Sequence, residues 1–500
     1  MSSSPLPRIE DPSHPFLDGR AKRMLIDGCW VESIAGRTFE TLNPATGKPI
    51  AAIARGEPED IDRAVTAARR AFDDSPWRAA KPAERQRLLL KFASLIEQHY
   101  DELALLDTLE MGMPVRTLQE RRARIIGLLH WYAGAATTIH GDTVSNSLPG
   151  DLFSCTLKEP VGVVGAITAW NGPLGAAVWK IAPVLATGCT MVLKPAEETS
   201  LTALRIGELL LEAGIPDGVV NIVPGSGTAG AALVAHPQVD KISMTGSVET
   251  GQKIVAASAG TLKRLSLELG GKSPNIVFAD ANLDVAVPSA AMAIFANTGQ
   301  ICAAGSRLFI ERSIYGEFIE RVADFGRKLR VGNGLDPQTQ LGPLVSERHL
   351  QRVTGYIDEG LREGAKLIAG GARLTAHELA HGYFVPPTVF ADVRDDMRIA
   401  REEIFGPVLC ALPFDDVDEV VRRANDTRFG LVGAVWTSNM RKAQHLMRAL
   451  RAGTVFVNCY GAADPDMPFG GYKMSGYGRE SGLEHLQDYL QTKAVFINSL

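Results

Sequence analysis

The stretch from Phe295 to Phe309 contains one cysteine, Cys302, among small and amide-bearing residues. No histidine, lysine or second cysteine lies close to it in the sequence. Gly299 and Gly305 allow the backbone to approach a ligand closely, because glycine has no side chain. A thiolate in such surroundings is a candidate nucleophile for a carbonyl carbon. Most free cysteines are instead buried as small hydrophobic residues, so other parts of the chain have to decide between the two interpretations.

The overall composition limits the kind of protein that this is. A chain of 500 residues is too long for one ordinary core, so two or three domains are expected. Its 45% hydrophobic and 22% charged residues are typical of soluble globular proteins. The net charge of -5 differs from the excess of positive charge that is typical of nucleic-acid-binding proteins. Six cysteines without CxxC pairs fit reduced thiols in the cytoplasm, and neither a secretory signal nor a membrane-spanning run is evident.

Strand and helix patterns alternate from Val161 onward. This alternation predicts an α/β fold with a doubly wound parallel sheet, which binds ligands at the carboxyl ends of its strands. A second α/β pattern after Pro274 predicts a second domain. Amphipathic helices predicted over residues 58–72, 82–96 and 101–111 would pack on the first sheet.

Residues 139–158 break this rhythm and predict a long hairpin with a turn at Pro149-Gly150. The exposed edges of such a hairpin are usually covered, and another subunit would cover them. The last segment, Thr492 to Asn498, has strand composition and is expected to pair with this hairpin or with another subunit. We therefore expect a homodimer or homotetramer.

Glycines at two strand-to-helix junctions suggest nucleotide binding. Gly225-Ser226-Gly227-Thr228-Ala229-Gly230 matches the dinucleotide fingerprint GxGxxG, and Gly246-Ser247 lies at the second junction. Either helix N-terminus could hold a pyrophosphate. Lys194 and Glu197 follow another strand, where a carboxylate suits the hydroxyls of a ribose.

Several segments together resemble the aldehyde dehydrogenase superfamily of NAD(P)-dependent enzymes. They are Glu159-Pro160-Val161-Gly162-Val163, Trp170-Asn171, Lys194-Pro195-Ala196-Glu197, Met244-Thr245-Gly246-Ser247, Leu267-Glu268-Leu269-Gly270-Gly271-Lys272-Ser273-Pro274, Gly299-Gln300-Ile301-Cys302, Glu402-Glu403-Ile404-Phe405-Gly406-Pro407-Val408 and Pro468-Phe469-Gly470-Gly471-Tyr472-Lys473. The resemblance implies a Rossmann-like NAD-binding domain over residues 1–138 and 159–270, with a loose N-terminal arm at 1–23. It also implies a catalytic domain at 271–470 and a small β oligomerisation arm at 139–158 and 485–500.

The resemblance assigns catalytic roles. Cys302 would attack the aldehyde carbon, and the Asn171 amide with the Cys302 backbone N–H would stabilise the oxyanion. After hydride transfer, Glu268 would activate the water that hydrolyses the thioester. Glu480 and Lys180 match positions proposed as a proton relay.

The resemblance also implies NAD as the cofactor, and no metal site. The corresponding cofactor-binding residues are Lys194, Glu197, Gly227, Gly246, Ser247, Leu269, Glu403 and Phe405. Lys194 and Glu197 would contact the adenosine ribose, Ser247 the pyrophosphate and Glu403 the nicotinamide ribose. NADP is disfavoured, because Glu197 would repel its 2′-phosphate.

The substrate pocket departs from the pattern common in this family. Gly172 replaces an aromatic residue that usually narrows the tunnel, and Ala463 also lies where an aromatic is often found. The pocket residues expected are Gly172, Ala176, Trp179, Ile301, Ala303, Ala463 and Phe469. Small residues at several wall positions predict a bulky, largely apolar aldehyde, either aromatic, cyclic or terpenoid. Asp464 and Asp466 leave a cationic aminoaldehyde as an alternative.

Three rival functions are compatible with parts of the sequence. His377-Glu378-Leu379-Ala380-His381 fits the HExxH motif of a zinc protease, if it forms an α-helix. A CoA-acylating semialdehyde dehydrogenase would pass the thioester to CoA, and Glu268 would then be dispensable. A purely structural role is disfavoured, because Cys302, Glu268 and Asn171 are all present.

Overall fold

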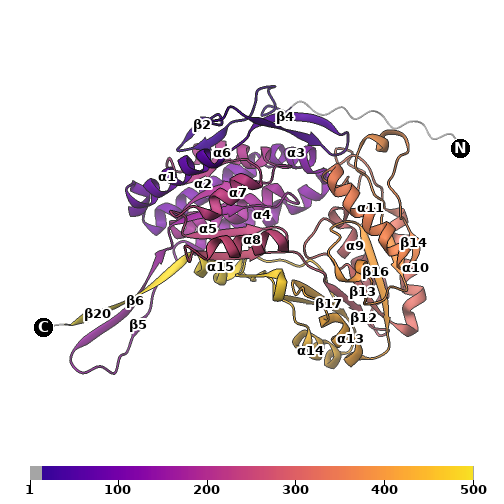
Figure 1. Ribbon diagram of the computed structural model, residues 1–500. Helices are drawn as coiled ribbons and strands as arrows, with labels where there is room; N and C mark the ends of the chain where they lie inside the picture. Colours follow the sequence, from indigo (N-terminus) through magenta and orange to yellow (C-terminus); the bar gives the residue numbers. More distant parts are fainter. Residues whose placement is uncertain (1–13, 499–500) are drawn as a thin grey trace.

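The computed structural model describes residues 14–498, which form two halves built around sheets and one projecting arm (Figure 1). Residues 1–13 of the predicted N-terminal arm and residues 499 and 500 lie outside the described residues. Within residues 14–498, no helix is long and apolar enough to cross a membrane.

The start of the described chain lies against the body of the protein. Residues 14–23 were predicted as part of a loose arm, but the Lys22 backbone N–H donates to the Ala52 carbonyl, and the Ala54 N–H donates to the Lys22 carbonyl. A hairpin with Asp27-Gly28 at its turn joins β1 (Met24–Ile26) to β2 (Cys29–Val31). A second hairpin follows, made of β3 (Thr38–Asn43) and β4 (Lys48–Ala54).

Four helices precede the main strand-helix alternation. They are α1 (Pro58–Asp73), α2 (Pro82–Gln98), α3 (Tyr100–Met111) and α4 (Val115–Ala135). Proline at the first position suits α1, and Glu57 and Asp60 close a capping box there. Ile61, Ala64, Val65 and Ala68 on the apolar face of α1 are buried, as the helical spacing predicts, and Phe72 is partly buried.

The first sheet has eight strands in the order β19-β11-β10-β7-β8-β9-β1-β2. Its further strands are β7 (Val163–Ile167), β8 (Thr190–Lys194), β9 (Val220–Ile222), β10 (Lys241–Thr245), β11 (Arg264–Glu268) and β19 (Gly476–Tyr477). The connecting helices are α5 (Pro173–Thr187), α6 (Leu201–Ala213), α7 (Gly227–Ala235) and α8 (Val248–Ser258). The strands from β11 to β9 are parallel, and the order reverses beside β7. A ligand-binding crevice is expected at such a reversal.

The second sheet has seven strands in the order β14-β15-β16-β13-β12-β17-β18. Its strands are β12 (Pro274–Val277), β13 (Arg307–Glu311), β14 (Lys366–Ala369), β15 (Thr388–Ala391), β16 (Val408–Phe414), β17 (Val432–Trp436) and β18 (Thr454–Val457). Its helices are α9 (Leu283–Phe295), α10 (Tyr315–Lys328), α11 (Glu347–Arg362), α12 (Arg398–Arg401), α13 (Val417–Asn425) and α14 (Met440–Ala449). All neighbouring strands are parallel except β14 and β15.

The chain then returns from the second sheet to the first. β19 pairs antiparallel with β11, and α15 (Gly482–Asp488) packs against α5. This return brings residues near 480 beside strands formed more than 200 residues earlier.

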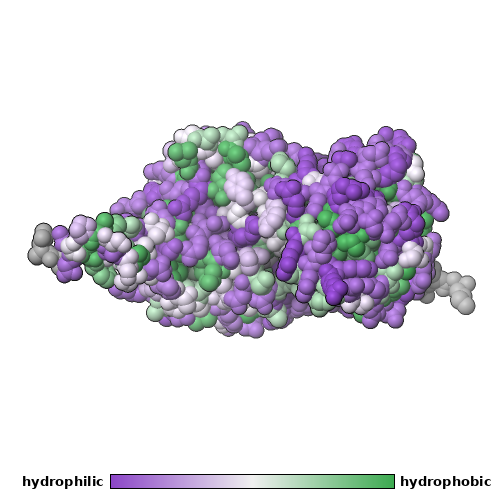
Figure 2. All heavy atoms as spheres, turned by 90° about the horizontal axis from the view of Figure 1, so that it is seen from below, coloured by the Kyte–Doolittle hydropathy of each residue, from purple (hydrophilic) through white to green (hydrophobic). Residues whose placement is uncertain are grey.

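The arm is a three-stranded sheet made of β5 (Thr143–Val144), β6 (Leu152–Pro160) and β20 (Leu490–Asn498). β20 pairs with β6 along its whole length, so the last strand does cover one edge of the predicted hairpin. The arm projects from the body and carries hydrophobic residues on its surface (Figures 1 and 2). Phe153, Leu157, Phe496 and Ile497 are all exposed there.

Candidate active site

Cys302 lies in the loop between α9 and β13, and its side chain is partly exposed. The preceding turn is unusual, because Asn297 and Thr298 adopt left-handed conformations with φ of 51° and 55°. Such conformations cost of the order of 1–3 kcal/mol each and persist only where the surroundings hold them. A Cβ on Gly299 would lie 2.0 Å from the Gly406 carbonyl oxygen, so only glycine fits this position. The loop that presents the thiol is therefore tightly constrained.

Asn171 connects the first sheet to this loop. It follows β7, and its Nδ2 donates to the Gln300 carbonyl oxygen at 2.9 Å. In return, the Asn297 amide donates to the Asn171 carbonyl oxygen at 3.1 Å. The two bonds tie Asn171 to Gln300 and Asn297, and Gln300 lies two residues before Cys302 in the sequence. An amide donor held before reaction is what stabilisation of an oxyanion requires.

Glu268 ends β11 and is 4% exposed. Neither of its carboxylate oxygens has a hydrogen-bond partner within the described chain. Burial raises the pKa of Glu268 well above its usual value, and the Glu480 carboxylate raises it further, while the Lys180 ammonium opposes the shift. A Cβ on Gly470 would lie 2.8 Å from Glu268 Oε1, so the backbone runs close beside this group. A buried acid without partners and with a raised pKa is a candidate proton acceptor.

Lys180 and Glu480 form a buried ion pair next to this acid. The Lys180 ammonium also donates to Ser243 Oγ at 3.0 Å. Lys180 belongs to α5, and Glu480 reaches it only because the chain returns through β19. The two residues that the sequence placed in a proton relay are therefore in direct contact.

Burial and nearby carboxylates disfavour the thiolate form of Cys302. Burial, followed by the carboxylates of Glu403, Glu268 and Glu480, raises the pKa of Cys302 to about 12. The reactive form of cysteine is the thiolate. The thiol must therefore lose its proton to a nearby base, or be stabilised by a bound positive charge, before it reacts.

The predicted adenosine-ribose residues lie at the end of β8. Lys194 is buried, and its ammonium donates to the carbonyl oxygens of Pro195 and Gly225, at 2.6 and 2.8 Å. Glu197 is exposed, so its carboxylate is open to a ligand. An exposed carboxylate at the carboxyl edge of a parallel sheet fits the two hydroxyls of a ribose.

The glycine turns lie at helix starts, as their positions in the sequence indicate. Ser247 caps α8 through a hydrogen bond from the Thr250 N–H, and Gly246 precedes it at the end of β10. Gly227 is the first residue of α7, and a Cβ there would meet open space. Both helices begin at the edge of the sheet where β8 ends at Lys194. An anionic pyrophosphate at this edge would be stabilised by the helix N-termini.

Glu403, Phe405 and Leu269 lie where the two sheets meet. Glu403 Oε1 accepts from the Gly271 N–H at 2.9 Å, and burial raises the pKa of Glu403 to about 7. Phe405 has a φ of 65°, and its ring packs edge-to-face on Trp170 at 5.3 Å. Leu269 is buried directly after Glu268. A small cavity beside the Cys302 loop is lined by Gly271, Gly299, Ile301, Glu403 and Phe405 among others.

The predicted pocket residues come from three segments. Gly172, Ala176 and Trp179 are partly exposed and follow one face of α5, because positions i, i+4 and i+7 of a helix point the same way. Ile301 and Ala303 flank Cys302 and are also partly exposed.

The remaining pocket residues lie after β18. Phe469 exchanges two backbone hydrogen bonds of 2.7 Å with Glu480, which fixes it beside that residue. Ala463 is exposed in the loop before it. The small residues expected to widen the pocket are therefore accessible rather than packed in a core.

Two arginines of α4 also face this region, although no sequence signal singled them out. Arg121 Nη1 lies 3.9 Å from the position that a Cβ on Gly172 would take. The Arg124 guanidinium lies over the Trp179 ring at 5.2 Å from its centroid. α4 also carries other arginines, and only the packing of α4 on α5 shows which of them face the site.

The HExxH motif does not form the α-helix that zinc binding would need. His377–His381 forms a single exposed 3-10 turn, with His377 at a φ of 52°. With three residues per turn, the two histidines do not share a face. The described residues contain no group of three potential metal ligands. The zinc-protease alternative is therefore wrong for this fold.

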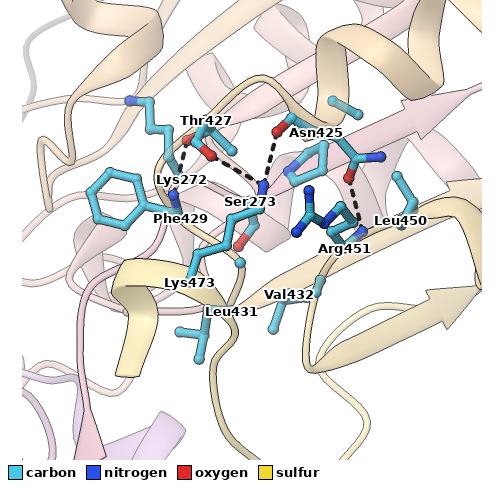
Figure 3. A pocket seen from close by; sticks show the side chains of 14 residues that line it. Lys272, Ser273, Asn425, Thr427, Phe429, Leu431, Val432, Leu450, Arg451 and Lys473 are labelled. Carbon is cyan, nitrogen blue, oxygen red and sulfur yellow. Dashed lines mark hydrogen bonds between the residues drawn. The ribbon is translucent and has the colours of Figure 1, made fainter. Parts of the chain in front are cut away.

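The loop that connects α13 to β17 lines a separate pocket (Figure 3). The Lys473 ammonium there donates to the carbonyl oxygens of Asn425 and Thr427, at 2.8 and 3.1 Å. The Asn425 side chain accepts from the Arg451 N–H. These bonds tie loops of the second sheet together, which is a structural role.

Comparison with known proteins agrees with this geometry. The model of the aldehyde dehydrogenase family matches residues 30–495. The DhaS protein of Bacillus subtilis (strain 168), named as an aldehyde dehydrogenase, is 50% identical, with 97% of each chain covered. The mitochondrial benzaldehyde dehydrogenase of Antirrhinum majus is 47% identical over 97% of this chain and 91% of its own. A structure of the Bacillus cereus aldehyde dehydrogenase in complex with NAD+ has a TM-score of 0.94 and 46% identity, with 97% and 98% covered. This chain therefore belongs to the aldehyde dehydrogenase family.

Proposed function

We propose that the protein oxidises an aldehyde to the carboxylic acid with NAD, through a covalent intermediate on Cys302. The carrying observation is the 2.9 Å hydrogen bond from Asn171 to Gln300, which joins an amide donor of one sheet to the cysteine loop of the other. NAD, when bound, supplies the acceptor for the hydride. The NAD-complexed Bacillus cereus relative supports this cofactor.

The chain's own residues account for the acyl-transfer steps. The Cys302 sulfur adds to the aldehyde carbon as its proton leaves, and the carbonyl oxygen becomes an oxyanion. The Asn171 amide donates to that oxygen, and loss of hydride from carbon then leaves a thioester. Water attacks the thioester, which breaks the carbon–sulfur bond and releases the acid and the thiol.

Glu268 is the proposed base for that water. Its two oxygens have no partner in the described part of the chain, so a water can donate to either of them. Burial raises its pKa well above the usual value, which makes it a stronger proton acceptor than an exposed carboxylate. The Lys180–Glu480 pair lies beside it and would pass this proton on toward solvent.

Glu197 favours NAD over NADP. Its carboxylate is exposed near the ribose site, where a 2′-phosphate would place a second negative charge. Lys194 and the helix starts at Gly227 and Ser247 would hold the adenosine and pyrophosphate, and Glu403 and Phe405 the nicotinamide end.

The proposed substrate is a bulky aldehyde. Gly172 and Ala176 are small and accessible, and a Cβ on Gly175 would meet nothing within 4 Å. The benzaldehyde dehydrogenase relative gives independent support for an aromatic substrate.

The arm supports a proposal for the oligomeric assembly, and the cysteines support one for the compartment. The exposed hydrophobic residues of β6 and β20 favour a homo-oligomer through the arm, which light scattering would test by showing a dimer or tetramer. Six free cysteines favour a reducing compartment such as the cytoplasm.

The decisive experiment follows NADH absorbance with a panel of small and bulky aldehydes, with and without CoA. We expect turnover without CoA, a higher kcat/KM for bulky aldehydes than for acetaldehyde, and no turnover in Cys302→Ala. Undiminished turnover in that variant would exclude the mechanism, and strict dependence on CoA would favour the acyl-CoA alternative. A preference for acetaldehyde over every bulky aldehyde would exclude the roomy pocket.

A further inference from the structure

Arg121 and Arg124 lie three positions apart on α4, so they share one face of the helix. That face is turned toward α5, where Arg121 approaches Gly172 and Arg124 covers Trp179. Gly172 directly follows Asn171, the proposed oxyanion donor. The two guanidinium groups therefore border the space that leads to Cys302.

Neither guanidinium has an anionic partner. Within residues 14–498, the side chains of Arg121 and Arg124 form no hydrogen bond or ion pair. Among acids, Asp107 has the largest effect on the pKa of Arg121. The Asp107 oxygens already accept hydrogen bonds from the Leu174 N–H and the Thr202 hydroxyl. Burial lowers the pKa of Arg121, and the Arg124 charge lowers it further, so the pair is held against mutual repulsion.

The adjacent helix makes the arrangement still less favourable without an anion. α5 begins at Pro173, and the positive end of its dipole faces the same region as Arg121. Two cations beside a helix N-terminus create a local positive potential. That potential is lowered when a negatively charged group occupies the space between them.

Room for such a group is present. A Cβ on Gly172 would have Arg121 Nη1 as its only neighbour within 4 Å, and a Cβ on Gly175 would have none. A larger side chain at position 172 would start 3.9 Å from Arg121 Nη1, whereas glycine leaves this side of the guanidinium open to a ligand.

From these observations we infer that the substrate is an aldehyde with a carboxylate at the end remote from the reacting carbon, bound by Arg121 and Arg124. The inference rests on the proposed aldehyde oxidation and specifies its substrate class. A planar carboxylate suits guanidinium groups, which donate two parallel hydrogen bonds. The apolar body of the substrate would lie along Gly172 and Ala176.

A cationic substrate has less support. Asp466 accepts a hydrogen bond from Trp131 Nε1, and Asp464 accepts from the Asp466 N–H. Trp131 lies two helical turns beyond Arg124 on α4, about 10 Å away by helix geometry. These carboxylates are exposed and already bonded, whereas Arg121 approaches Gly172 and Arg124 covers the Trp179 ring.

The test compares three aromatic aldehydes that differ in charge: 4-formylbenzoate, its methyl ester and 4-(trimethylammonio)benzaldehyde. We expect kcat/KM for 4-formylbenzoate to exceed that for the ester by about tenfold to a hundredfold, as charge-assisted hydrogen bonds provide. The ratio should fall toward one in the R121Q/R124Q double variant and be partly retained in R121K/R124K. It should also fall as salt is added.

The matched control is R122Q. Arg122 lies between the two arginines in sequence but points to Asp101 and the Glu97 carbonyl oxygen, so R122Q should keep the full preference. As a readout without turnover, terephthalate should raise the thermal midpoint of the wild type and not of folded R121Q/R124Q.

Each outcome decides the matter. A ratio of one or less in the wild type, preference for the cationic aldehyde, or an unchanged ratio in the double variant would overturn the inference while leaving aldehyde oxidation intact. Failure to form NADH from any of the three aldehydes, with terephthalate still stabilising the protein, would instead count against the proposed function.

Discussion

Two carboxylates are buried in the half of the protein built on the first sheet, and they differ in their hydrogen-bond partners. On α3, Glu110 accepts hydrogen bonds from the Thr41 hydroxyl and from the N–H groups of Ser200 and Leu201, at 2.9–3.1 Å. At the end of β11, Glu268 is equally hidden from solvent but has no hydrogen-bond partner among the described residues.

The difference separates an acid with a structural role from the acid that we propose as the base. Burial raises the pKa of both groups, to about 8 for Glu110 and well above the usual value for Glu268. The donors around Glu110 oppose its shift and use its lone pairs, which ties three chain segments together. The lone pairs of Glu268 stay available to a water or a thiol, at a cost in stability that a purely structural residue would not carry.

The largest expected effect is on turnover in Glu268→Gln. Loss of a general base lowers rates by about 10²–10⁴-fold, so steady-state NADH formation should fall by that factor. Stopped-flow measurements should still show the first rapid burst of NADH, because acylation of Cys302 precedes hydrolysis. The unfolding free energy should not decrease, since no hydrogen bond is lost. A normal steady-state rate would show that another group activates the water.

A smaller effect is expected on stability in Glu110→Ala. Three buried donors would lose their acceptor, at about 1–3 kcal/mol for each, so urea unfolding should show a loss of several kcal/mol. Glu97→Ala, at an exposed position on α2, is the matched control and should change little. Equal stability of the two variants would remove the distinction between the two acids.

The pH dependence of the unfolding free energy should reveal the raised pKa of Glu110. The folded pKa of Glu110, about 8, exceeds its ordinary value of 4.5, so the native state binds the extra proton between these values. The stability that this protonation contributes is complete below pH 4.5 and is lost as pH rises through 8. Unfolding titrations at several pH values should show a shallower decline in Glu110→Gln than in the wild type. An identical decline would contradict the assignment.

The smallest effect is expected in Lys180→Met. The Lys180 ammonium partly offsets the rise in the pKa of Glu268 that burial and Glu480 cause. Its removal should move the acidic limb of the hydrolysis rate to higher pH, whereas Lys180→Arg should move it less. Single-turnover hydrolysis measured across pH would detect this shift, and an unmoved profile would show that the ion pair does not act on Glu268.

The sequence by itself determined the order of strands and helices and several of their ends. Proline at the first turn of α1, glycine at strand-to-helix junctions and the apolar periodicity act through neighbours within a few residues, so they can be read locally. The spacing of the motifs also placed Cys302, Glu268 and Asn171 in one family pattern.

The partners of these side chains were decided only by the tertiary structure. Lys180 contacts Glu480, which lies 300 positions away in the sequence. β20 pairs with β6 of the same chain. The HExxH residues form a 3-10 turn instead of an α-helix. Whether Glu268 keeps its oxygens free, and whether Arg121 rather than Arg122 faces Gly172, depends on which distant segments pack beside them. Burial and pairing are properties of those long-range contacts, and no local pattern specifies them.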